Sequence, residues 1–153
     1  MRKFTLLLVL WAAMIIPLWP EIWSESRTLA WDEDPASFIG YTLSELIQRF
    51  GVPRSVYPVR GLQEWDDDVV FVYDEGDFYI IKDRVWQIGL SSAYLIQAGD
   101  SRAAVHLSFG QSLLSGEDFA IFPLGGHNWP LAMRFNFDST GRVTVIFIYR
   151  SDI

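Results

Sequence analysis

A twelve-residue phrase that occurs twice constrains the fold of this chain more than any other feature. Residues 40–51 and 99–110 both follow the pattern Gly-x-[Thr/Ser]-x-x-x-[Leu/Val]-x-x-x-Phe-Gly, and the two copies begin 59 residues apart. Each copy precedes a stretch rich in β-branched and aromatic residues. Because self-similarity at a fixed spacing is typical of repeated structural units, we predict a tandem repeat of one small α/β unit.

The first copy carries the signals of a short amphipathic helix. Thr42 is a favourable N-cap, and Glu45 lies three residues later, where it completes a capping box. Gly51 suits the end of a helix, because glycine readily adopts the left-handed conformation found there. Apolar residues recur at helical spacing, at Leu43, Leu46, Ile47 and Phe50. The pattern predicts a helix that packs on an apolar surface.

After a polar connection over residues 54–61, the pattern changes to strands. Runs of β-branched and aromatic residues at 69–73, 78–81 and 84–90 are separated by short polar turns, which predicts an antiparallel meander. Three aspartates at 66–68 raise the question of a cation site. Since adjacent strand residues point to opposite faces of a sheet, we predict no metal site there.

The second copy repeats the same pattern with fewer apolar residues on its helical face. Ser101 can serve as its N-cap, whereas Arg102 and His106 occupy positions that are apolar in the first copy. The alternating apolar residues of this segment also fit a strand, and only the match to the first copy favours a helix. Further strand-like runs follow at 119–124, 131–137 and 142–149.

The N-terminus reads as an export signal. Arg2 and Lys3 precede a nearly unbroken apolar stretch over residues 4–19, which is short for a membrane-spanning helix. We predict a signal peptide over residues 1–26 and a linker over 27–37, in a periplasmic or secreted protein. The alternative is that the segment remains uncleaved and anchors the protein to the inner membrane.

Composition restricts the class of partner. The chain has no cysteine, which excludes both disulfides and a lipid-modified N-terminal cysteine. Its net charge of −7 and its lack of a basic run argue against nucleic acid or an anionic lipid surface as a partner. We therefore expect membrane contact only through an uncleaved N-terminal segment.

These residues carry a family resemblance. The pattern Gly40-x-Thr42-x-x-Glu45-Leu46-x-x-x-Phe50-Gly51-x-Pro53, followed by a tryptophan and strands, resembles the SmpA/OmlA family of BamE-like exported domains. Two such units in tandem also resemble the β-lactamase inhibitor protein (BLIP-like) fold. The resemblance implies a helical layer on an antiparallel sheet, with protein binding as the function. The chain departs from the assembly lipoproteins in lacking their lipidated cysteine.

The predicted fold class is α+β. We expect two tandem helix-plus-antiparallel-meander units, at residues 38–95 and 96–153, with the helices packed on one face of a continuous antiparallel sheet.

No catalytic motif stands out in the sequence. A thiol nucleophile, a Gly-x-Ser-x-Gly elbow and a Gly-rich phosphate loop are all missing, and His106 and His127 are the only histidines. We predict a protein that is not an enzyme and has no catalytic residues, no cofactor and no metal. An envelope hydrolase whose site is assembled across the repeat junction remains the alternative from another class.

The excess of aromatic residues points to binding. Bulky residues occupy both the odd and the even positions of the strands, so some of them must face away from the helices. Tryptophan and tyrosine are enriched at protein interfaces. We predict a non-catalytic binding or scaffold module of the cell envelope with an unidentified protein partner. Its binding residues would be Trp65, Tyr73, Tyr79, Trp86, His127 and Trp129. The alternatives are a secreted inhibitor of an extracytoplasmic enzyme, or a face covered by the N-terminal segment or by a second copy in a homodimer.

Overall fold

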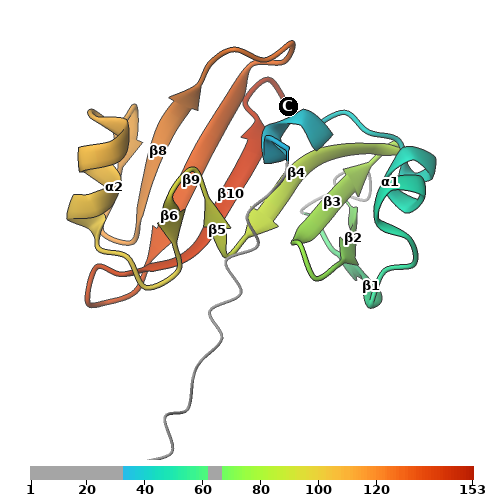
Figure 1. Ribbon diagram of the computed structural model, residues 1–153, viewed down its shortest axis with the longest axis horizontal. Coiled ribbons are helices and arrows are strands. Elements are labelled where there is room, and N and C mark those ends of the chain that lie inside the picture. Colours follow the sequence, from blue (N-terminus) through green and yellow to red (C-terminus); the bar gives the residue numbers. More distant parts are fainter. Residues whose placement is uncertain (1–32, 62–66) are drawn as a thin grey trace, which may run out of the picture.

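One antiparallel sheet of eight strands dominates the structure (Figure 1). The computed structural model describes residues 33–61 and 67–153. The sheet order is β1-β2-β3-β4-β10-β9-β8-β7. Its strands are β1 (Ser55–Val59), β2 (Asp68–Val72), β3 (Asp77–Ile81), β4 (Arg84–Leu90), β7 (Leu114–Ser115), β8 (Phe119–Leu124), β9 (Leu131–Phe137) and β10 (Val143–Arg150). A separate hairpin is formed by β5 (Ser92–Ala93) and β6 (Ile96–Gln97).

The two α-helices begin and end where their sequences predict. Helix α1 (Leu43–Phe50) has Thr42 as its N-cap, and the capping box with Glu45 is complete. Helix α2 (Arg102–Phe109) is capped by Ser101, whose hydroxyl accepts a hydrogen bond from the amide of Ala104. The second phrase is therefore a helix and not a strand.

The two copies of the phrase are held on the sheet by equivalent hydrogen bonds. The amide of Gly40 donates to the carbonyl of Val85 at 2.8 Å, and the amide of Gly99 donates to the carbonyl of Val143 at 2.8 Å. An arginine strengthens each junction, since Arg84 donates to the Gly40 carbonyl and Arg142 to the Gly99 carbonyl. These arginines directly precede Val85 and Val143 in the chain, so the same local sequence produces the same local contact.

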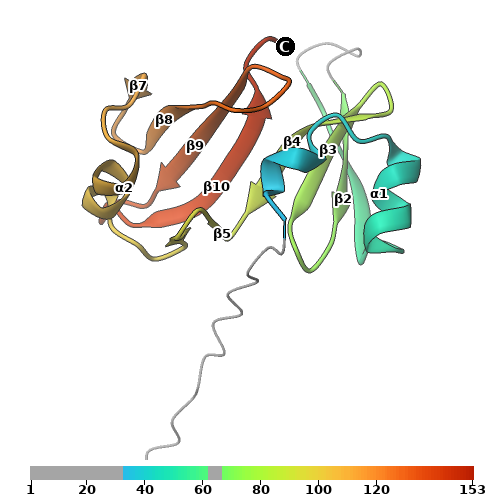
Figure 2. The same cartoon turned by 45° about the horizontal axis from the view of Figure 1, so that its top comes forward.

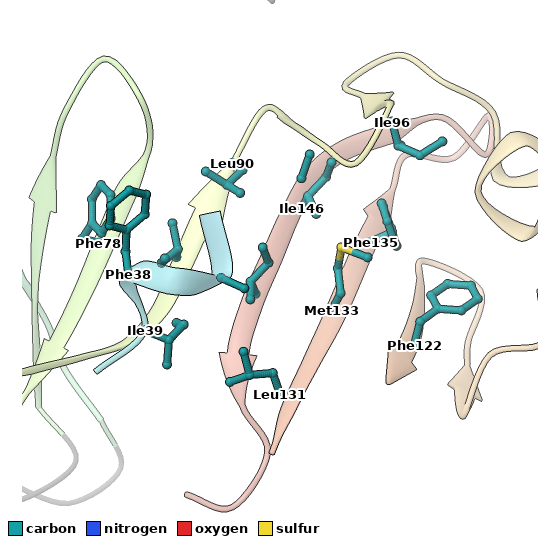
Figure 3. Close-up of a cluster of buried hydrophobic side chains, with 14 of the residues drawn as sticks. Phe38, Ile39, Phe78, Leu90, Ile96, Phe122, Leu131, Met133, Phe135 and Ile146 are labelled. Atoms are coloured by element: carbon teal, nitrogen blue, oxygen red, sulfur yellow. The ribbon is translucent and has the colours of Figure 1, made fainter. Parts of the chain in front are cut away.

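The hydrophobic core lies on one face of the sheet. The 3-10 helix η1 (Pro35–Phe38) inserts Phe38, which is fully buried, and Ile39 follows it into the core. Figure 3 shows Phe38 beside Phe78 at one end of this core, with Met133, Phe135 and Phe122 at the other. The hairpin adds Ala93 and Ile96 to the same cluster. The core face of the sheet is thus covered by η1 and the hairpin as well as by the two helices.

The predicted fold class is wrong. The described residues do not form two tandem helix-plus-meander units; they are mostly one large antiparallel sheet with two α-helices of eight residues each. Main-chain pairing of β4 with β10 joins all eight strands into that sheet, which removes two edges that separate units would leave open. Each helix contributes only one fully buried residue, Leu46 or Val105, so the helices are minor elements beside the sheet. Ile47, predicted on the packed face of α1, is 42% exposed.

Other elements were not anticipated from the sequence. Residues 35–37, predicted as the end of a linker, form η1 together with Phe38 and are anchored in the core. Part of the expected polar connection is strand β1, all of whose residues are exposed. The predicted signal peptide lies outside the described residues, and the boundary expected between residues 95 and 96 stays a prediction. Within residues 33–61 and 67–153, no helix is long and apolar enough to cross a membrane.

Candidate functional site

The register of the strands divides the sheet into two faces. Directly paired residues of neighbouring strands point to the same face. One continuous row contains only residues of the core or packed against it, and it consists of Phe71, Phe78, Ile88, Ile148, Met133 and Phe122. The row of the other parity consists of Tyr57, Val70, Tyr79, Gln87, Tyr149, Ala132 and Pro123. We call the face that carries this second row the open face.

In the described part of the chain, every element outside the sheet that contributes to the core packs on the core face. Helices α1 and α2, the 3-10 helix and the hairpin all place residues in the core cluster. Val70 and Ala132 are also buried, at 0% and 4% exposure, yet they lie outside that cluster. Neighbouring side chains on the open face cover them, so the side chains of this face pack against one another.

Aromatic rings provide this packing on the open face. The rings of Tyr79 on β3 and Phe147 on β10 meet edge to face, with centroids 6.1 Å apart. Phe147 reaches across β4 above Gly89, where a Cβ atom would lie only 3.2 Å from its Cε1 atom. The missing side chain of Gly89 leaves the space that the Phe147 ring occupies.

Trp86 on β4 is held in place by a polar contact. Its indole Nε1 donates to Oδ1 of Asp68 on β2 at 3.1 Å. Asp68 is only 8% exposed, so this hydrogen bond lies in a partly dry environment where it holds the ring firmly. Of the three aspartates considered as a cation site, Asp66 lies outside the described residues, and Asp67 pairs with Arg60 at 2.5 Å. The described residues contain no group of three or more histidines and carboxylates suited to a metal ion.

A shallow groove of about 480 Å³ runs over the middle of the open face. It lies over β4, β10 and β9, beside the last residues of the chain. Its lining consists of Trp86, Gln87, Arg134, Asn136, Phe147, Tyr149, Arg150, Ser151 and Ile153. Its volume falls within the range of about 300–1,000 Å³ that is usual for ligand-binding pockets.

Arg134 is held in a fixed orientation beside this groove. Its guanidinium carbon lies 4.6 Å from the centre of the Phe119 ring, in a cation–π contact. Its Nε atom donates to Oδ1 of Asn136 at 2.7 Å. Two contacts on different sides of the guanidinium therefore fix its plane while its two Nη groups stay available.

Burial changes the proton affinity of two groups on this face. Burial raises the pKa of Tyr79 from 10.0 to about 12, and the nearby Tyr57 and two aspartates add to the effect. Burial also raises the pKa of Asp77, which faces Gly89 across the β3–β4 pair. Both shifts have desolvation as their largest cause, so the open face is a partly dehydrated surface.

The structure distributes the predicted binding residues over different places. Tyr79 and Trp86 lie on the open face. Tyr73 does not, because it is 6% exposed and its ring packs against Phe50 and Phe78 in the core. Its hydroxyl donates to the carbonyl of Gly51 at 3.2 Å. Trp65 lies outside the described residues.

His127 and Trp129 lie in the loop between β8 and β9, and this loop packs against the start of the described chain. Nε2 of His127 is 3.5 Å from Oδ2 of Asp34, and the other carboxylate oxygen, Oδ1, accepts a hydrogen bond from the Tyr94 hydroxyl. Trp129 is 42% exposed and stacks under the Arg150 guanidinium at 4.1 Å. Arg150 also lines the groove, so Trp129 is connected to the groove only through its contact with Arg150.

The other histidine belongs to helix α2. His106 is half-buried, its ring meets Phe122 at 5.4 Å, and its Nδ1 atom lies 3.2 Å from the Gly110 carbonyl. Its contacts are those of a residue that helps to close the end of a helix, and they include none with the His127 cluster.

Sequence reasoning missed the residues of β9 and β10 that complete the open face. Phe147 and Tyr149 lie at one parity of β10, while the buried Ile146 and Ile148 lie at the other. This alternation is readable in the sequence, but the pairing of β10 with β4 that brings these rings to Tyr79 and Trp86 is not.

Comparisons with known proteins were made for the whole chain. No protein-family model and no curated protein matches it. Among solved structures it is similar to an extracellular protein containing a SCP domain from Bacillus anthracis str. Ames, with 14% identity, a TM-score of 0.51, and coverage of 78% of this chain and 46% of that one. It is also similar to a cysteine-rich secretory protein from Staphylococcus aureus subsp. aureus Mu50, with 14% identity, a TM-score of 0.50, and coverage of 79% and 47%.

These neighbours overturn the family resemblance seen in the sequence. They are proteins described by a SCP domain or as cysteine-rich secretory, not BamE-like or BLIP-like tandem domains, so that prediction is wrong. The prediction failed because the twelve-residue phrase encodes a capped helix and a hydrogen bond to the sheet. These are local features that different folds can share. At 14% identity the likeness shows the fold alone.

The chain spans about half the length of these neighbours. The structures are named as an extracellular and a secretory protein, and this agrees with the export predicted from the N-terminal segment. The name "cysteine-rich" has no counterpart here, because this chain contains no cysteine.

Proposed function

We propose that this protein is an exported, non-catalytic module that binds another polypeptide through its open face. The observation that carries the proposal is the set of half-buried aromatic rings around the groove, namely Tyr79, Trp86, Phe147 and Tyr149. Large rings that lose little conformational freedom on binding are the usual anchors of protein interfaces. Tyr79 and Phe147 are already restrained by their mutual contact, and Trp86 is restrained by its hydrogen bond to Asp68.

The construction of the face also supports a binding function. A rigid antiparallel sheet holds the rings at regular spacing, and the groove between them is lined by a few polar side chains. Preorganised surfaces of this kind reduce the entropy lost on association. Binding therefore requires little rearrangement of this face.

The structural neighbours support the idea of a module. The part similar to this chain makes up less than half of each neighbour. A fold of this type thus occurs within longer extracellular proteins, where it adjoins further polypeptide. We place the module in the cell envelope, either free in the periplasm or secreted, or held at the inner membrane by an uncleaved N-terminal segment.

Site-specific photo-crosslinking tests the proposal. A photoreactive amino acid replaces Gln87, which lies in the groove, in cells that produce this protein. Leu107 on α2 is 89% exposed and lies away from the groove, and the same replacement there serves as the matched control. We expect adducts with one defined polypeptide from position 87 and none from position 107, with mass spectrometry mapping the joined peptides to the open face.

The Trp86→Ala and Tyr149→Ala variants sharpen this experiment. Each should reduce the adduct from position 87 severalfold while the protein stays folded, because truncating an interface anchor costs about 2 kcal/mol or more of binding. Equal adducts from positions 87 and 107, or no adduct from position 87, would refute the proposal. If the captured polypeptide is an enzyme that this protein inactivates, the module acts as an inhibitor.

A further inference from the structure

The groove on the open face has a charge that differs from that of the protein as a whole. The chain carries a net charge of −7, yet the charged side chains that line the groove are Arg134 and Arg150. Arg150 is neutralised by Asp152, to which its Nε and Nη2 atoms donate at 3.0 and 2.8 Å. Arg134 therefore supplies a positive charge in the groove that pairs with no carboxylate side chain among the described residues.

Arg134 is also distinct among the arginines of residues 33–61 and 67–153. Each of the others pairs with a carboxylate or donates to main-chain carbonyls. Arg49, Arg54, Arg60 and Arg150 have carboxylate partners, whereas Arg84, Arg102 and Arg142 donate to carbonyls. Arg134 donates only through Nε to Asn136, and among the described residues its Nη groups have no hydrogen-bond partner.

The fixed plane of this guanidinium suits a carboxylate. A guanidinium binds a carboxylate best through two parallel N–H groups, and a side chain already held in place loses less entropy when it does so. The stacking on Phe119 and the bond to Asn136 provide that restraint. Phe147 lies next to Arg134 on the paired strand, so an apolar surface adjoins the cation.

We propose that the groove binds an acidic peptide segment, with a glutamate or aspartate side chain of the ligand on the Nη groups of Arg134. Apolar side chains beside that carboxylate pack on Phe147 and Trp86. This proposal rests on the proposed function and adds the chemistry of the partner: an acidic residue flanked by apolar ones.

The polar groups of the groove favour a peptide over an acidic sugar. The indole N–H of Trp86 is used by Asp68, and Oδ1 of Asn136 is used by Arg134. The other polar side chains of the lining are Gln87, Tyr149 and Ser151, which can pair with the main chain of a peptide. The aromatic surface beside one prepared cation matches an apolar peptide segment carrying a single carboxylate.

An NMR titration tests this assignment with defined probes. The purified full chain is titrated with acetyl-Ala-Leu-Glu-Leu-Ala-amide and with the same peptide carrying Gln in place of Glu. We expect the Glu peptide to shift the Arg134 Nε–H and Trp86 indole N–H signals and to bind about tenfold more tightly than the Gln peptide, since charge-assisted bidentate hydrogen bonds are strong.

Three variants locate the effect. Arg134→Gln should bind both peptides equally weakly, and Arg134→Lys, which keeps the charge but loses the fork, should give an intermediate affinity. Arg54→Gln removes an exposed arginine that is paired with Asp74 away from the groove, so it should bind like the unchanged protein. The comparison of the two peptides on the unchanged protein decides the matter even if a variant fails to fold.

Each remaining outcome overturns the inference. A preference for the Glu peptide that survives in Arg134→Gln, or no binding of either peptide, removes the assigned carboxylate site. Glucuronate that binds as tightly as the Glu peptide makes it an acidic-sugar site instead. The proposed function fails separately: if the Arg134→Gln protein still forms the crosslink from position 87, the face binds a polypeptide but not through this carboxylate contact.

Discussion

The indole ring of Trp129 lies directly against Gly40, so that a Cβ atom added to Gly40 would come within 2.9 Å of the Trp129 Nε1 atom. The two residues lie far apart in the chain. Gly40 has φ of +93° and bridges η1 to the sheet through its hydrogen bond to Val85. Trp129 is held from its other side by Arg150. This contact joins the β8–β9 loop to the first copy of the repeated phrase.

Gly40→Ala should therefore destabilise the protein more than Gly99→Ala. Gly99 has φ of +94°, almost the same as Gly40, but nothing lies within 4 Å of a Cβ atom added there. Both variants bear the strain of a side chain at positive φ, about 1–3 kcal/mol. Gly40→Ala must also displace the indole, which should add about 1 kcal/mol. Urea unfolding monitored by circular dichroism measures both losses.

A double-mutant cycle isolates the Trp129 contribution. In a Trp129→Ala background the extra cost of Gly40→Ala over Gly99→Ala should disappear, because the clash has been removed. An extra cost that persists would place its origin in the backbone and not in the indole.

The aromatic residues that end the two helices should be major contributors to stability. Phe50 packs against Phe38 and Phe78, and Phe109 packs against Phe122 and Phe135. Truncation of either to Ala should lower the free energy of unfolding by about 3 kcal/mol or more. Leu107→Ala is the control, since its side chain is 89% exposed and should change stability by less than about 0.5 kcal/mol. Losses at Phe50 and Phe109 no larger than at Leu107 would contradict this packing.

Acid should remove the contribution of the capping box on α1. Hydrogen bonds from the backbone and side chain of Thr42 lower the pKa of Glu45 below its ordinary value of 4.5. A carboxylate with a lowered folded pKa stabilises the protein fully above the unfolded value, and this contribution is lost as pH falls through the folded value. The stability difference between the unchanged protein and Glu45→Gln should thus be constant above about pH 4.5 and shrink below it. Unfolding curves across this range test the expectation, and a difference independent of pH would contradict it.

Alkali should expose the environment of Tyr79. Burial raises its pKa from 10.0 to about 12, so the unfolded chain loses this proton first. The stabilisation is complete below pH 10 and is lost as pH rises toward 12. Over this interval the unchanged protein should lose stability relative to Tyr79→Phe, as measured by urea unfolding. Parallel stability curves for the two proteins would show that Tyr79 ionises as freely as in the unfolded chain.

Local structure was predictable because it depends on neighbours in the chain. The helix over residues 43–50 was anticipated with its capping box, and the central strands were anticipated to within one or two residues. Strand β1 was missed because its residues are all exposed, so no alternation of buried and exposed positions marks it. The 3-10 helix was missed because an acidic, proline-containing segment resembles a linker until its Phe38 is seen in the core.

The candidate site was predictable only in part. Tyr79 and Trp86 were expected on the open face and lie there, whereas Tyr73 was expected there and lies in the core. Tyr73 lies two residues after Phe71 and shares its core face, and the sequence did not show which parity of this strand faces the core. Nothing in the sequence indicated a role for Arg134. Its role depends on the partners of the other arginines, and those partners are known only from the tertiary structure.

The sequence by itself determined the capped helices, the positions of most strands, the acidic charge and the apolar N-terminal segment, since each depends on residues adjacent in the chain. Only the tertiary structure decided that β4 pairs with β10 (Figure 2), which makes one eight-stranded sheet. The same pairing brings Trp86, Phe147 and Tyr149 around a single groove. Strand pairing is a long-range choice: main-chain hydrogen bonds are the same for any two strands, and the partner is selected by how completely the whole sheet buries its core face.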